Sequence, residues 1–152
     1  MKRVTGEVVP RLCIDENSMK ITFGKPRMVR RRKYRKPTKA EREHYLLHKE
    51  AARELVLARL VHFNQHYGYT YKRVAIRNQR TRWGSCSSNG NLNFNYRIVF
   101  LPAHLADYII VHELCHLREL NHAQAFWNLV ALQCPEYKKR AAELRTIKFG
   151  KL

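Results

Sequence analysis

The chain has 152 residues, 45% of them hydrophobic, which suits one globular domain over residues 1–152 and excludes a disordered chain. No apolar run approaches the roughly 20 residues of a membrane-spanning helix, and the first residues lack the apolar core of a secretion signal. The formal net charge of +18 favours polyanionic partners. The four cysteines form no CxxC pair and are typical of reduced thiols, so we expect a cytoplasmic protein without membrane contact.

The basic charge is most concentrated in segment 25–39, which carries nine basic residues and no acidic one. Such a segment attracts nucleic acid, although a solvated loop or edge strand explains the composition equally well. The candidate nucleic-acid-binding residues are Arg30, Arg31, Arg32, Lys33 and Arg35. Residues 1–37 as a whole are expected to form a basic, β-rich N-terminal segment.

A long helix is predicted over residues 38–67. Thr38 and Glu41 form a T-x-x-E capping box at its start, and Gly68 is a suitable stop. The apolar stripe expected to face the core consists of Leu47, Ala51, Leu55 and Ala58, widened by Val56, Leu60 and Phe63. Two histidine pairs at i, i+4 spacing have no third ligand nearby, so surface or core roles are expected for His44 with His48 and His62 with His66.

Strands and a hairpin are expected over residues 71–100. Asn89-Gly90 predicts a two-residue type I′ turn. The alternation that follows predicts one apolar strand face, formed by Leu92, Phe94, Tyr96 and Ile98. The edge of this hairpin either receives an extended substrate by strand addition or only covers the core, and the pattern does not decide between them.

Residues 102–148 are expected to contain a helix opened by Pro102 and further C-terminal helices. The first of these helices carries His112, Glu113 and His116 in an H-E-x-x-H pattern. Residues four apart lie on one helical face, so both imidazoles can bind one cation while the carboxylate lies beside it. If the helix breaks near Asn121, His122 can reach the same ion. Three protein ligands leave a fourth position for water, as in a catalytic zinc site.

Segment 82–127 resembles the YgjP-like family of small zinc metallopeptidases, which is related to the WLM group. The resemblance rests on RWGSCS, NLNFN and VHELxHLRExNHxxxFW, in that order. It implies a zincin-like α+β fold, with a small twisted, mostly antiparallel sheet packed on the long N-terminal helix and on the catalytic helix. It also implies one Zn²⁺ per chain, with Glu113 as general base and acid for a metal-bound water. The zinc ligands that it implies are His112, His116 and His122.

The predicted function is therefore hydrolysis of a peptide or protein. The candidate substrate-binding residues are Trp83, Asn93 and Asn95, and the group that stabilises the oxyanion is left open among Tyr137, Arg82 and Arg97. Two alternatives stand beside this prediction: a metal-dependent hydrolase of nucleotides or phosphoanhydrides, and a nucleic-acid-binding module with a structural zinc.

Overall fold

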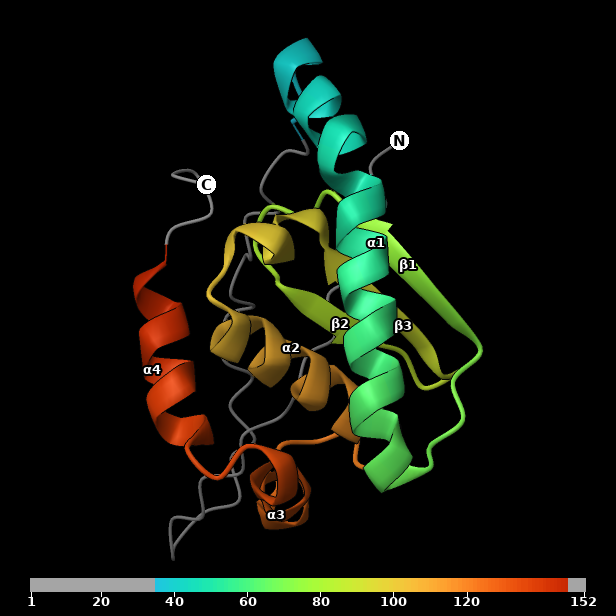
Figure 1. The fold of residues 1–152 in the computed structure, drawn as a ribbon, viewed down its shortest axis with the longest axis vertical. Helices are drawn as coiled ribbons and strands as arrows, with labels where there is room; N and C mark the ends of the chain where they lie inside the picture. The colour runs from blue at the N-terminus through green and yellow to red at the C-terminus, as the bar shows by residue number, and fades with distance from the viewer. Residues whose placement is uncertain (1–34, 148–152) are drawn as a thin grey trace, which may run out of the picture. The chain divides into compact units, whose positions relative to one another are not determined.

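The structure is a computed structural model that describes residues 35–147. In chain order it contains α1 (Lys39–Tyr67), β1 (Arg73–Arg77), β2 (Gly84–Cys86), β3 (Asn91–Asn95), the 3₁₀ helix η1 (Tyr96–Phe100), α2 (Ala103–Cys115), α3 (Gln124–Gln133) and α4 (Tyr137–Thr146) (Figure 1). The predicted α+β class is confirmed. The strands expected within residues 1–37 lie outside the described residues, as do four candidates of the basic segment, Arg30, Arg31, Arg32 and Lys33; Arg35 is described and exposed.

Both ends of α1 follow from local hydrogen bonds. The backbone N–H of Glu41 donates to Thr38 Oγ1 at 3.2 Å, and the N–H of Thr38 donates to Glu41 Oε2 at 2.7 Å. At the other end, Gly68 has a φ of 64° and its N–H donates to the carbonyl of Asn64. The predicted capping box and glycine stop are therefore confirmed.

The buried face of α1 is not the predicted one. Leu47 is 75% exposed, and Ala51 and Ala58 are exposed as well. The helix instead buries Ala52, Val56, Leu60 and Phe63. Two apolar stripes lie side by side on this helix, and the rest of the protein packs on the one with the larger side chains because it removes more apolar area from water. Val56, Leu60 and Phe63, which were expected only to widen the buried stripe, thus form its centre.

The sheet has the strand order β1-β3-β2 (Figure 1). β2 pairs with β3 in antiparallel fashion, whereas β1 pairs with β3 in parallel, from Arg73 beside Asn91 to Arg77 beside Asn95. The sheet is therefore mixed, and its longer pairing departs from the mostly antiparallel sheet expected. The hairpin folds so that its second strand lies beside β1, and β2 lies at an edge of the sheet formed by the described strands.

The hairpin is confirmed, but its turn is of another type. A type I′ turn needs a positive φ at both central residues, and no described residue other than glycine has one. Only Gly90 is left-handed at this turn, with a φ of 72°, and its N–H donates to the carbonyl of Ser87 at 2.9 Å. β3 also ends earlier than predicted, because Asn95 Oδ1 accepts the N–H of Arg97 and caps η1.

α2 is the central helix of the unit Pro37–Leu152. It contacts α1, α3, α4 and β2, and in Figure 1 it lies between α1 and α4. It is buried along most of its length, whereas α4 buries no residue fully. None of the helices between residues 35 and 147 is both long and apolar enough to cross a bilayer. A helix that is apolar on nearly every side therefore carries the H-E-x-x-H pattern into the core.

Candidate metal centre

α2 ends at Cys115, earlier than the predicted end near Leu120. His116 forms the C-cap, and its Nδ1 lies 2.9 Å from the carbonyl oxygen of Glu119. This side-chain contact stabilises a turn directly after the helix. No described residue other than glycine has a positive φ, so the chain turns here without a left-handed residue. Asn121 Oδ1 instead accepts the N–H of Ala123, just before α3 begins.

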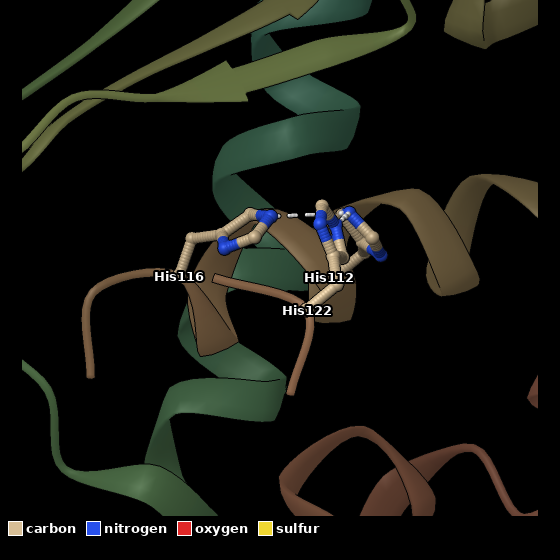
Figure 2. A group of neighbouring side chains, drawn as sticks. All are labelled: His112, His116 and His122. Atoms are coloured by element: carbon tan, nitrogen blue, oxygen red, sulfur yellow. Dashed lines mark hydrogen bonds between the residues drawn. The ribbon is translucent and has the colours of Figure 1, made fainter. Parts of the chain in front are cut away.

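The early turn brings His122 back to the end of α2, from the segment between α2 and α3. His112 Nε2 lies 3.2 Å from Nε2 of His116 and 3.1 Å from Nε2 of His122 (Figure 2). Zinc ligands at 2.0–2.1 Å in tetrahedral geometry have nitrogen atoms about 3.3 Å apart, which matches both distances from His112. The ligand atoms of all three rings lie within 4.8 Å of one another, so one ion can reach all three. Within residues 35–147, this is the only group of three or more His, Cys, Asp or Glu close enough to hold a metal.

The environment of His112 and His116 keeps these two imidazoles in the form that binds metals. A backbone carbonyl accepts only from a protonated nitrogen, so Nδ1 of His116 carries the proton and Nε2 keeps its lone pair. Burial lowers the pKa of His112 to about 3, helped by the charges of the two neighbouring imidazoles. Burial also lowers the pKa of His116. Neutral rings are the ligand form, and the donor set therefore fits a zinc site.

Phe126 of α3 forms the apolar wall behind all three imidazoles. It is fully buried, and its ring centroid lies 4.9 Å from that of His112, 4.4 Å from that of His116 and 4.8 Å from that of His122. The ring planes of Phe126 and His116 are 26° apart, so these two rings stack. Phe126 thus fixes the rings of α2 and of the following segment against one surface.

Glu113 lies next to the histidines on the sheet side of α2. Its side chain is 6% exposed, and its Oε2 is buried without a hydrogen-bond partner. Burial raises the pKa of the Glu113 carboxyl to about 8, against an opposing effect of the Arg82 charge. A carboxyl held in an apolar place with one free oxygen is suited to taking and returning a proton.

Gly84 of β2 is a site residue that the sequence analysis did not identify. A Cβ atom at this position would lie 2.6 Å from both Cγ and Oε1 of Glu113. The strand therefore packs directly against the carboxyl, and only glycine leaves room for it. A glycine inside a strand pattern is the signal for such a close approach, and it was present in the RWGSCS motif.

A cleft of about 250 Å³ joins these groups. One side consists of the histidine group with Glu113, and the other side consists of β2 with Arg82. The lining residues are Arg82, Gly84, Ser85, Cys86, His112, Glu113, His116, Leu120 and His122.

The three predicted substrate-binding residues do not line this cleft. Asn93 pairs with Ser85, and side chains alternate along a strand, so it points to the sheet face opposite that of Gly84 and Glu113. Asn95 is fully buried and bonded to backbone groups, and Trp83 packs against the core. Of the three candidates for the oxyanion, Arg82 lines the cleft, whereas Tyr137 stacks on Trp127 and Arg97 donates to Asn78.

Gly84→Ala is expected to lower activity about 100-fold, because the new methyl group must displace Glu113, and a shift of about 1 Å in a catalytic group has an effect of this size. Bound metal should not change. The control is Gly90→Ala, which strains the left-handed turn at the far end of the hairpin but adds no atom near Glu113. It should lower the melting temperature and leave the activity of the folded enzyme intact. Equal activity losses in both variants would contradict the contact with Glu113.

Comparisons with known proteins find metallopeptidases similar to this chain. The family model of the YgjP-like metallopeptidase domain matches residues 6–147. Among solved structures, the metallopeptidase zymogen abylysin of Pyrococcus abyssi has a TM-score of 0.55 at 26% identity, covering 60% of this chain and 92% of that one. The zymogen jannalysin of Methanocaldococcus jannaschii has a TM-score of 0.44 at 22% identity, covering 63% of this chain and 97% of that one. A search of curated proteins finds no match.

The family match spans most of the chain, including the H-E-x-x-H helix and the strands that pack against it. The chain therefore belongs to the YgjP-like metallopeptidase family, and it is a metal-dependent hydrolase of peptides or proteins.

Proposed function

We propose that this metallopeptidase uses one zinc ion, held by His112, His116 and His122, with Glu113 as its general base and acid. The observation that carries the proposal is the convergence of three Nε2 atoms beside a buried carboxyl group in one cleft. No fourth ligand joins the group among the residues that the structure describes, which favours a catalytic site over a closed structural one.

A zinc ion at this position supplies a Lewis acid that polarises the scissile carbonyl and lowers the pKa of water toward 7. Glu113 takes the proton of the attacking water with its free oxygen and later gives it to the leaving amine. A pKa near neutrality suits both transfers, because one group must first accept the proton and then release it. Phe126 packs against the imidazoles and β2 packs against Glu113, so both sides of this exchange are held by apolar or backbone contacts.

The position of β2 supports binding of an extended peptide. Among the described strands β2 lies at an edge of the sheet, and its residues Gly84, Ser85 and Cys86 line the cleft. A peptide that pairs with this strand would lie along the cleft that the histidine group also lines. Strand addition provides backbone hydrogen bonds without regard to sequence, and side-chain contacts then set the preference.

Two further predictions from the sequence remain proposals. Nucleic acid is proposed to contact segment 25–39, where the basic charge is densest. The absence of CxxC pairs supports a reducing, cytoplasmic location. A nucleic-acid contact of this kind depends on charge, so the logarithm of its affinity should fall steeply as the logarithm of the salt concentration rises.

The metal requirement is tested by chelation. Purified protein is expected to contain about one zinc per chain and to cleave peptides; a chelator should abolish cleavage, and added zinc should restore it.

His116→Ala should lose both the metal and the activity. His62→Ala is the matched control, because His62 is exposed on α1 and takes no part in the histidine group. The proposal would be refuted if His116→Ala still bound zinc, or if the protein still cleaved peptides after complete removal of the metal.

A further inference from the structure

The stretch of sequence that forms the sheet contains basic residues and no acidic one. Between Glu54 and Asp107 the sequence contains no acidic residue. All three strands lie in this stretch. Its basic residues are Arg59, Lys72, Arg73, Arg77, Arg80, Arg82 and Arg97. Among the described residues that line the cleft, Glu113 on the helix side is the only one with a carboxyl group, and Arg82 on the sheet side is the only Arg or Lys. In this part of the protein, the side of the cleft that β2 forms therefore offers a substrate a cationic group and no anionic one.

Arg82 brings this charge into the cleft itself. It is an exposed residue that lines the cleft together with Glu113, and its charge acts on that carboxyl group. Within residues 35–147 it forms no ion pair, in contrast to Arg59, which donates two hydrogen bonds to Asp107. The described protein thus offers the guanidinium no carboxylate in an ion pair, although the group lines the same cleft as the histidines and Glu113.

The backbone of Arg82 is fixed by a buried residue. Asn95 Nδ2 donates to the carbonyl oxygen of Arg82 at 2.9 Å and to that of Gln79 at 2.7 Å. The N–H of Asn95 donates to the carbonyl oxygen of Trp83 at 2.7 Å. Asn95 is 0% exposed, so water does not compete for these bonds. The segment between β1 and β2 is therefore held in place, and Arg82 projects from an ordered position.

We propose that Arg82 is a specificity residue that binds a carboxylate of the peptide substrate, so that the enzyme prefers acidic peptides. This inference rests on the peptidase function proposed above. A guanidinium presents two parallel N–H donors to a carboxylate, which fixes both the charge and the orientation of the bound group. The carboxylate belongs either to an Asp or Glu side chain near the scissile bond or to the C-terminus of the peptide, and both sources offer the same chemistry.

The test compares peptides that differ in one carboxylate. One series exchanges Glu for Gln at each position around a common scissile bond, and a second exchanges a free C-terminus for its amide. The wild type is expected to cleave the better acidic member with a KM roughly 3- to 10-fold lower than that of its neutral partner. Arg82→Gln should remove this difference, and Arg82→Lys should keep part of it. Arg73→Gln removes the same charge from an exposed residue outside the cleft, so it should retain the preference.

Binding without turnover separates this inference from the peptidase function. In zinc-loaded Glu113→Gln protein, fluorescence anisotropy of a labelled acidic peptide should show a Kd roughly 3- to 10-fold higher once Arg82 is also replaced by Gln. The neutral peptide should bind both proteins equally. If no peptide is cleaved by the wild type, the proposed function fails, and this binding measurement still decides the role of Arg82.

Three results would overturn the inference. Equal cleavage of the acidic and neutral members of every pair would show that no carboxylate is recognised. A fall in kcat of the same size on acidic and neutral peptides in Arg82→Gln would place Arg82 at the reacting atoms or at Glu113 instead. Arg82-dependent binding of a nucleotide or phosphopeptide, without a preference among the carboxylate pairs, would assign the guanidinium to phosphate.

Discussion

Glu113→Gln is expected to lower peptide turnover about 100- to 10 000-fold, the range by which positioned acid–base groups accelerate reactions. Gln keeps the shape of the side chain and so respects the contact with Gly84, but it cannot accept a proton. Zinc should stay bound in the same amount, because the three imidazoles are untouched. Single-turnover kinetics on a peptide, together with metal analysis of the same sample, measures both quantities.

The pH dependence of unfolding provides the control for this substitution. Because burial raises the pKa of Glu113 to about 8, folded metal-free protein holds a proton that the unfolded chain releases at its ordinary pKa near 4.5. The free energy of unfolding of the wild type should therefore fall as pH rises from about 4.5 to about 8. Glu113→Gln should lack this part of the slope. Identical slopes would show that the carboxyl is not buried, and unchanged turnover would remove Glu113 from the mechanism.

Phe126→Ala is expected to reduce the free energy of unfolding by about 3–5 kcal/mol, the usual effect of removing a buried aromatic ring. The same change should weaken zinc binding at least about tenfold, because the three imidazoles lose the surface that orients them. Denaturant unfolding with a chelator present measures the first effect. Competition with a zinc indicator dye, under conditions where the variant is folded, measures the second.

Leu132→Ala is the matched control on the same helix. Leu132 is 59% exposed, so its replacement should change stability by no more than about 0.5 kcal/mol and leave zinc affinity unchanged. If Phe126→Ala lowered stability alone, with zinc affinity as in the wild type, the ring would be an ordinary core residue. The assignment of Phe126 as the wall of the metal centre would then be wrong.

The features that the sequence predicted well depend on residues close together in the chain. The capping box of Thr38 and Glu41 and the stop at Gly68 are formed by hydrogen bonds within one turn of helix. The neighbouring positions of His112 and His116 follow from helical periodicity alone. These features do not depend on which other elements pack around them, so the local sequence is sufficient to predict them.

The features that the sequence did not predict depend on distant partners. The parallel pairing of β1 with β3 is decided by how the hairpin folds back, and the strand pattern is the same for either orientation. The buried stripe of α1 was misplaced because two apolar stripes compete, and only the packing of other elements selects one. The early end of α2 depends on the contact between His116 and the Glu119 carbonyl. The role of Gly84 likewise appears only when β2 lies against Glu113.

In the proposed zinc site, the place of His122 would couple metal binding to local order. Two of the three imidazoles belong to the end of a buried helix, whereas the third lies in the irregular segment that leads to α3. An ion held by all three closes a short loop, and the chain between residues 116 and 122 then opens only when a coordination bond breaks. Amide hydrogen exchange in this loop should therefore be slower when zinc is bound than after zinc is removed. The ion that supports catalysis would then also hold the segment between α2 and α3 in place.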